Sequence, residues 1–358
     1  MRFSVFSSNW FWFVSFRFSS SLFYIGSLFS LNKVPTQEPG PIAELFRGPD
    51  GCLVPPIPKP KWTRFHITFT TADGLVVSCG SLHFNQVPTS CMVLKRQAEG
   101  LVWQEDSTKM GRPGVSQQGA IAVTLPLGVY LIRGSQTDTI QFLPHGDTQW
   151  KQESYPHVFA KTPCAVTISQ TAFMLIGHKT WSSSTIKIHE FDASGPDGPT
   201  AQSGWKPGNT WPSLKKFRHY GHSCQLYYSK VVVAGGVSCG KCVEIIDLAT
   251  KKVTHGPDLV QARSFFGLTT FERDGNPQLV AYGGRGESGS LDTVEVLHEE
   301  TNVWQTIPEK LSREQHVFQG KYAALTKHVE ENICAGIIGN GICHYLFRIS
   351  TNGWNSYK

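Results

Sequence analysis

The sequence of 358 residues lacks the motifs that would point to an enzyme, a helical protein or a nucleic-acid-binding protein. It contains no P-loop, no G-x-S-x-G nucleophile elbow and no H-E-x-x-H zinc motif, and its 13 histidines are scattered singly. No long stretch repeats its apolar residues with the 3.6-residue period of a helix. The net charge of +6 is dispersed rather than gathered into a basic stripe, which argues against nucleic acid as a partner. We therefore expect no catalytic residues, no metal site and no cofactor.

The chain does contain 34 glycines and 21 prolines between many short apolar runs, which favours an all-β protein. Residues 1–31 are rich in Phe, Trp, Leu and Ser and contain no acid, which is typical of a secretory signal or signal-anchor. Arg17 interrupts this apolar run, so a spurious extension is the alternative, and membrane contact is expected only if the segment is an anchor. Eight prolines in residues 32–61 predict a stiff linker.

A unit of short strands recurs in the remaining residues, 62–358. In residues 218–258 an apolar run at 231–234 ends in a pair of glycines, and the strand V-E-I-I-D follows it. Residues 280–284 and 294–297 repeat the apolar run, the glycine pair and the V-E strand. Four short strands in about 40 residues cannot bury both faces of a sheet, so such a unit needs copies of itself to stack against.

This pattern resembles the Kelch repeat, in which an apolar strand ends in a glycine pair, a V-E strand follows, and a Trp comes about ten residues later. Trp304 follows Val294 by ten residues, and Trp150 and Trp354 stand at the same distance from Ile140 and His344. The second-glycine position recurs at the roughly 50-residue Kelch period, at Gly80, Gly134, Gly177, Gly236, Gly284 and Gly336. The resemblance implies a six-bladed Kelch-type β-propeller of four-stranded antiparallel blades over residues 62–358.

The glycines and the Trp of this pattern have structural roles. Glycine permits a positive φ and a close backbone approach where the second strand ends. The large apolar body of the Trp is expected to fill the wedge between adjacent blades. Neither is expected to contact a partner.

Five arginines are candidates for partner binding because of their places in the repeat. Four of them stand between the last strand of one blade and the first strand of the next, and Arg285 follows a glycine pair; the four are Arg112, Arg218, Arg263 and Arg313. In the Kelch family these loops line one face and often hold an acidic or polar peptide. The planar guanidinium fork suits carboxylates. The alternative is that an Arg at this repeat position braces neighbouring blades.

The nine cysteines suggest disulfides at the second-to-third-strand hairpins. Aligned blades bring Cys79 near Cys91, Cys334 near Cys343, and Cys239 near Cys242, which predicts three short-range bridges. Such bridges would place the chain in an oxidising compartment, whereas the absence of any N-x-Ser/Thr sequon counts against secretion. The alternative is that these cysteines are free core residues. Cys239-x-x-Cys242 could be half of a zinc site, but no second pair with fitting spacing stands nearby.

These observations favour a non-enzymatic binding propeller, secreted or lumenal and monomeric, whose partner is a protein or a glycan. One alternative is a cytoplasmic substrate-recognition propeller of a cullin-type ubiquitin ligase adaptor that lacks its BTB domain. A sialidase- or oxidase-like propeller enzyme is disfavoured, because its arginine cluster or metal constellation is not evident. Paired cysteines would support the first hypothesis, and nine free thiols the second.

Overall fold

The structure is a computed structural model, and it describes fifteen separate parts of the chain: residues 64–71, 75–81, 90–97, 100–106, 121–132, 139–154, 163–177, 185–199, 202–216, 218, 220–273, 276–310, 323–329, 332–339 and 342–350. All of them belong to the unit Pro41–Lys358. The predicted signal and linker segments, residues 1–31 and 32–61, lie outside the described residues.

The first three sheets follow the chain in order and are antiparallel throughout. The first has four strands, β1 (Arg64–Thr70), β2 (Val76–Ser81), β3 (Ser90–Gln97) and β4 (Gly100–Glu105). The second also has four, β5 (Ile121–Leu125), β6 (Gly128–Ile132), β7 (Thr139–Pro144) and β8 (Lys151–Ser154). The third has three, β9 (Cys164–Thr167), β10 (Ala172–Gly177) and β11 (Lys187–Asp192).

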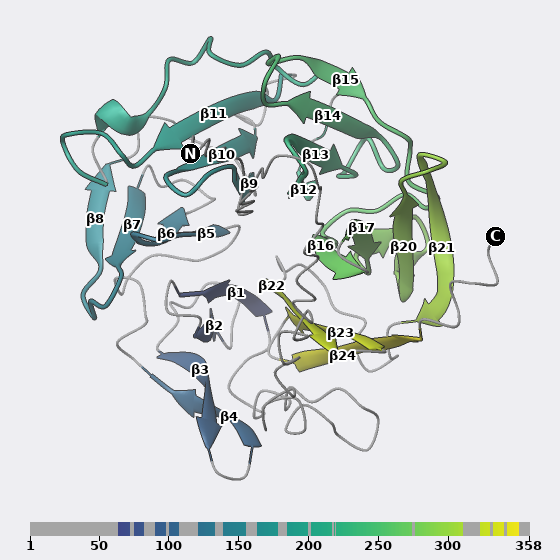
Figure 1. Ribbon diagram of the computed structural model, residues 1–358, viewed down its shortest axis with the longest axis horizontal. Helices are drawn as coiled ribbons and strands as arrows, with labels where there is room; N and C mark the ends of the chain where they lie inside the picture. Colours follow the sequence, from purple (N-terminus) through teal and green to yellow (C-terminus); the bar gives the residue numbers. More distant parts are fainter. Residues whose placement is uncertain are drawn as a thin grey trace, which may run out of the picture. The chain divides into compact units, whose positions relative to one another are not determined.

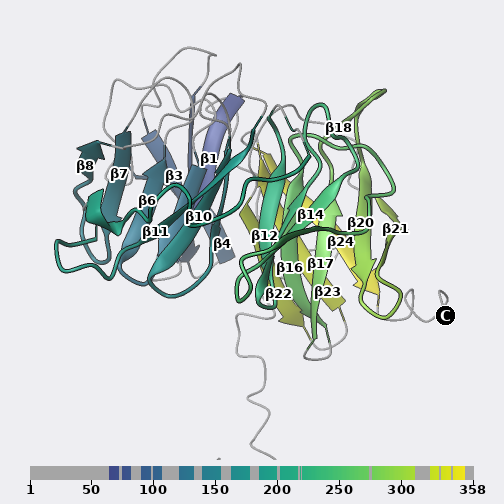
Figure 2. The same ribbon diagram turned by 90° about the horizontal axis from the view of Figure 1, so that it is seen from above.

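The later sheets repeat the same order of neighbours. The fourth holds β12 (Ser223–Tyr227), β13 (Lys230–Ala234), β14 (Val243–Asp247) and β15 (Val253–His255). The fifth holds β16 (Gly267–Arg273), β17 (Asn276–Tyr282), β20 (Thr293–His298) and β21 (Val303–Lys310). The sixth has three strands, β22 (Ala323–Val329), β23 (Asn332–Gly339) and β24 (Ile342–Ser350). A two-stranded hairpin, β18 (Arg285–Gly286) and β19 (Gly289–Ser290), stands at one end of the fifth sheet (Figure 2).

The third sheet departs from the expected four strands. Its fourth strand is reduced to a bridge between Phe191 and Trp205, next to which the Lys206 N–H donates to the Glu190 carbonyl at 3.0 Å. Pro207 follows and has no N–H, so the ladder cannot continue through it. The segment before Trp205 folds into turns and a 3-10 helix, η2 (Gln202–Gly204), the single helix of the described residues.

Successive sheets pack against one another through their first strands. In chain order β1 contacts β5, β5 contacts β9, β9 contacts β12, β12 contacts β16 and β16 contacts β22, while β22 contacts β1 (Figure 1). Each of the four core clusters in the described residues is shared between two successive sheets. The second strands β6 and β10 are buried along their whole length, because each has a sheet on both sides. This all-β arrangement of antiparallel sheets is compatible with a Kelch β-propeller.

The Trp side chains lie where the repeat pattern predicts. Trp304 is 2% exposed and packs in the cluster between the fourth and fifth sheets. Trp150 packs against the cluster between the first two sheets, with its ring edge-on to Phe69 at a centroid distance of 6.1 Å. The prediction that these side chains fill the wedge between sheets is confirmed for both. Trp354 lies outside the described residues.

Candidate functional site

The fourth and fifth sheets each bury an arginine that pairs with a glutamate of the third strand. Arg218 pairs with Glu244 and Arg263 pairs with Glu295, the latter at 2.7 Å between Nη2 and Oε1. The four side chains are at most 1% exposed. Burial lowers the pKa of both guanidinium groups, and the paired glutamate acts in the opposite direction. An arginine this deep in the sheet cannot reach a partner protein.

Each guanidinium group also binds the carbonyls at the end of the second strand. The Arg218 Nε donates to the Gly235 carbonyl at 3.0 Å, and the Arg263 Nη1 donates to the Gly283 carbonyl at 2.8 Å. Both carbonyls belong to the first glycine of a pair. The arginine therefore ties the incoming loop to the second and third strands of its own sheet.

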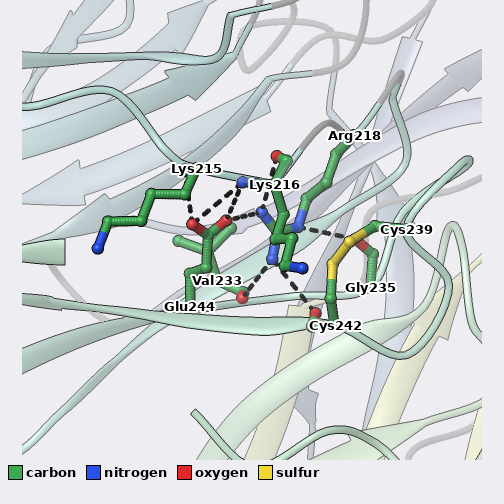
Figure 3. Close-up of a disulfide and its surroundings, with 8 residues drawn as sticks. All are labelled: Lys215, Lys216, Arg218, Val233, Gly235, Cys239, Cys242 and Glu244. Atoms are coloured by element: carbon green, nitrogen blue, oxygen red, sulfur yellow. Dashed lines mark hydrogen bonds and ion pairs between the residues drawn. A yellow bond between two sulfur atoms is a disulfide. The ribbon is translucent and has the colours of Figure 1, made fainter. Parts of the chain in front are cut away.

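The glutamates complete the network by accepting backbone N–H groups of the incoming loop. Glu244 accepts from the Lys215 N–H at 2.7 Å (Figure 3). Glu295 accepts from the Val260 N–H at 2.7 Å. Both donors stand three residues before the paired arginine, so the two networks are copies of one another. A Val-Glu step near the start of the third strand, repeated in both sheets, is the sequence signal for this pair.

The glycine pairs are needed for the same loops to approach. Gly235 has a φ of 62°, and a Cβ there would lie 2.5 Å from the Arg263 carbonyl oxygen. Gly284 has a φ of 89°, and a Cβ there would lie 2.7 Å from the Ser264 carbonyl oxygen. Any side chain at either position would push away the loop that enters the fifth sheet.

Residues 275–311 match the Kelch motif. The matched segment includes the whole of β17, β20 and β21, and with them the buried pair partner Glu295 and the buried Trp304. The match supports a Kelch-repeat family, as the resemblance predicted. No curated protein matches the chain.

The predicted partner-binding arginines divide into three groups. The prediction is wrong for Arg218 and Arg263, because both are buried in ion pairs and brace their own sheets. Arg112 and Arg313 lie outside the described residues. Arg285 is exposed on β18 and stays a candidate.

Arg285 belongs to a set of loops that meet at one end of the fourth and fifth sheets. In an antiparallel sheet of this order, the loop before the first strand and the loop after the second strand stand at the same end. We call these segments the rim loops: residues 215–222 (217 and 219 excepted), 235–242, 259–266 and 283–293. Backbone hydrogen bonds join them, from the Val237 N–H to Tyr220 at 2.8 Å and between Ser264 and Arg285 in both directions.

Two aromatic side chains on the rim loops were missed by the sequence reasoning. The Tyr220 and Phe265 rings are tilted against each other with centroids 5.5 Å apart, and both are half-buried. Phe265 has a φ of 54°, a left-handed conformation that is an outlier for a bulky side chain. Its N–H donates to the Gly221 carbonyl at 2.7 Å, which helps to hold it there. Strain of this kind clusters at functional sites.

The strain at Phe265 predicts an unusual order of stability for two substitutions. Phe265→Ala and Phe265→Gly both remove the ring, but alanine keeps the left-handed penalty of about 1 kcal/mol and glycine does not. Phe265→Gly should therefore be the more stable variant by about 1 kcal/mol in chemical denaturation. The same pair at Phe266, whose φ is not positive, should show the reverse order. Identical orders at the two positions would contradict the assignment of strain.

Two disulfides have both of their cysteines among the described side chains. Cys239 and Cys242 are bridged in the rim loop that follows β13, with Cα atoms 5.5 Å apart (Figure 3). Cys164 of β9 and Cys224 of β12 are bridged with Cα atoms 5.8 Å apart. The second bridge joins the first strands of two successive sheets. The sequence reasoning missed it because it compared cysteines within one blade.

The backbone registers of two hairpins bear on the other predicted bridges. Cys79 lies opposite Cys91 in the pairing of β2 with β3, and Cys91 is buried and disulfide-bonded, while the Cys79 side chain lies outside the described part of the chain. Cys343 lies opposite Ile338, whereas Cys334 lies opposite Arg348. Four residues of strand separate Cys334 from Ile338, or about 13 Å. In this register the predicted Cys334–Cys343 bridge is wrong, because a disulfide needs Cα atoms within about 7 Å.

The bridge between β9 and β12 predicts a measurable loss of stability when it is removed. It closes a loop with a sequence separation of 60 residues, so it constrains the unfolded chain strongly. We expect Cys164→Ala/Cys224→Ala to lower the free energy of unfolding by about 2–4 kcal/mol in urea denaturation. The control is Cys239→Ala/Cys242→Ala, whose much shorter loop should cost less. An equal loss in both variants would contradict this reasoning.

Neither a metal centre nor a membrane span is found among the residues described. Their His, Cys, Asp and Glu side chains form no group of three or more that could hold a metal ion. In the same part of the chain no helix has the length and apolar character needed to cross a membrane. The two disulfides weakly suggest an oxidising compartment.

Proposed function

We propose that this chain is a non-enzymatic protein-binding module: a six-bladed Kelch-type β-propeller, secreted or lumenal, that holds a partner protein on its rim loops. The Kelch match and the four-stranded antiparallel sheets support the propeller. The contact of β22 with β1 supports closure of six sheets into a ring. Two disulfides in the described residues support the secretory environment.

The observation that carries the binding proposal is the aromatic pair Tyr220 and Phe265, in which Phe265 has a strained backbone. The pair lies between two sheets, where the loops that enter the fourth and fifth sheets meet. Aromatic side chains held rigidly at a surface bury a large apolar area with little loss of conformational entropy, and they are enriched among the residues that dominate protein interfaces. The left-handed backbone of Phe265 costs free energy in the unbound protein. Contact of its ring with a partner would explain why this conformation is present.

The chemistry of the partner follows from the place of Arg285. Ser264 and Arg285 exchange backbone hydrogen bonds of 2.9 and 2.8 Å, so Arg285 is held one residue from the aromatic pair. Arg285 is an exposed residue, and a guanidinium group suits a carboxylate in bidentate geometry. The partner segment we propose carries an apolar or aromatic side chain for Tyr220 and Phe265, and an Asp or Glu for Arg285.

The experiment compares partner capture by the intact chain and two variants. Tyr220→Ala/Arg285→Ala removes one ring of the aromatic pair and the guanidinium group of Arg285. Tyr228→Ala is the matched control, because Tyr228 is 50% exposed, has a φ of 53°, and lies in the turn at the opposite end of β12. The intact chain and the control should be cross-linked to the same proteins. The amount of these proteins cross-linked to the double variant should be about tenfold lower.

Two results would overturn the proposal. One is an unchanged set of cross-linked proteins with the double variant. The other is an equal loss with Tyr228→Ala, which would move the interface to the opposite end of the sheet. Turnover of a substrate by the purified chain would overturn the non-enzymatic part.

A further inference from the structure

The Cys239–Cys242 bridge differs from the other described disulfide in that one of its two cysteines, Cys239, is not fully buried. Cys239 is half-buried in the rim loop, and Cys242 is 7% exposed. Cys164 and Cys224 are both buried, at 3% and 8%, between two sheets. A thiolate can attack a disulfide only where it can reach a sulfur atom. Cys239 is therefore the more accessible point of attack.

The residues inside the bridge hold the next rim loop in place. The Leu259 N–H donates to the Lys241 carbonyl at 2.9 Å, and the Arg263 N–H donates to the Gly240 carbonyl at 3.1 Å. Both carbonyls belong to the two residues between the cysteines. The segment that they hold, residues 259–263, leads directly into Phe265. A single set of backbone hydrogen bonds therefore connects the bridged loop to the segment that carries Phe265.

Two residues of the bridged loop have left-handed backbone conformations, which we expect the loop to lose when the bridge is reduced. Ser238 has a φ of 80° and Gly240 a φ of 61°. A left-handed conformation is unfavourable for a non-glycine residue, so Ser238, next to the bridge, gains by relaxing once the bridge is cut. Relaxation would move the Gly240 and Lys241 carbonyls away from their donors.

We propose that Cys239–Cys242 is a thiol–disulfide exchange site, and that its reduction frees the Leu259 and Arg263 amides from their acceptors and so loosens the one rim loop, residues 259–266, that carries Phe265. The release of these amides is independent of binding, whereas its effect on a partner rests on the proposed function above. The reductant is a dithiol, either a small molecule or a protein. The oxidised chain is the form in which the aromatic pair is held.

The exchange proceeds in two balanced steps. A thiolate of the reductant attacks Cys239 Sγ, forms a mixed disulfide with it, and displaces Cys242 as a thiolate that takes up a proton. The second thiolate of the reductant then attacks the reductant sulfur in the mixed disulfide, and Cys239 leaves and is protonated. Two electrons and two protons pass to the cysteines, and the dithiol becomes a disulfide.

The test measures amide hydrogen exchange in the full chain, without any partner, before and after mild treatment with dithiothreitol. Differential alkylation read by mass spectrometry reports which cysteines have been reduced, and Cys239 and Cys242 should react before Cys164 and Cys224. Exchange at the Leu259 and Arg263 amides should then become faster by about tenfold or more. The Leu291 amide, which donates to the Gly284 carbonyl at 2.8 Å, is the control and should not change.

The variant Cys239→Ser/Cys242→Ser gives a second reading. Its Leu259 and Arg263 amides should exchange rapidly whether or not dithiothreitol is present. Unchanged exchange at these amides in the reduced chain, or equal acceleration at Leu291, would overturn the proposal. Reduction of Cys164–Cys224 first would overturn it as well. A failure of partner capture alone would count against the proposed function and leave this result untouched.

Discussion

Glu295→Ala is expected to lower the free energy of unfolding by about 3–5 kcal/mol, because it leaves the Arg263 guanidinium buried without its counter-charge. The arginine and glutamate side chains are both 0% exposed, so water cannot replace the lost carboxylate without opening the sheet. The substitution also removes the acceptor of the Val260 and Gln261 N–H groups. Chemical denaturation of the purified chain measures the loss.

Two further variants test whether the loss of stability in Glu295→Ala comes from the broken ion pair. Glu299→Ala is the control, because Glu299 is exposed and its change should stay within about 0.5 kcal/mol. Arg263→Leu/Glu295→Leu should cost less than Glu295→Ala alone, since no unpaired charge stays buried. A loss below about 1 kcal/mol for Glu295→Ala would show that Arg263 reaches water and would reopen its role in partner binding.

Trp304→Ala is expected to lower the free energy of unfolding by about 3–5 kcal/mol, the usual cost of truncating a buried Trp. The side chain is 2% exposed and shares a cluster with Val232 of the fourth sheet and Leu279 of the fifth. Its removal leaves a cavity between two sheets that cannot collapse without moving one of them. Urea denaturation of the variant and the intact chain gives the difference.

The neighbouring residue supplies a control for this measurement. Val303 is 50% exposed, so Val303→Ala should change stability by about 0.5 kcal/mol or less. Trp304→Phe should be much milder than Trp304→Ala, because Trp304 Nε1 is buried with no hydrogen-bond partner in the described residues and phenylalanine keeps most of the apolar volume. A loss under about 1 kcal/mol for Trp304→Ala would mean that the repeat alignment is wrong.

The secondary structure of the repeat was predictable because its causes are local. An apolar run of four residues such as 231–234 can lie in a strand buried on both faces, and β13 is such a strand. A glycine pair after it predicts a backbone that needs positive φ, and Gly235 and Gly236 have φ of 62° and 102°. The ten-residue step to Trp304 follows from the length of one strand and one turn.

The roles of the arginines and cysteines were less predictable because they depend on contacts between distant residues. The sequence placed Arg218 in a loop, where an exposed cation is the ordinary expectation. In the structure the Arg218 side chain is buried and forms an ion pair with Glu244. The partner of Cys164 stands 60 residues away on another sheet. The register of β23 with β24 separates Cys334 from Cys343, although the loop between them favours a hairpin.

By itself, the sequence determined the repeat, the strands, the glycine turns and the Trp wedges of this protein, since each depends on residues within one unit of about 50. The tertiary structure decided which charges are buried, which cysteines meet and which side chains stand on the rim loops. Those outcomes depend on how one sheet packs against the next. Arg263 shows the physical reason: its guanidinium group is stable in the interior only because Glu295 and two backbone carbonyls are brought to it from elsewhere in the chain.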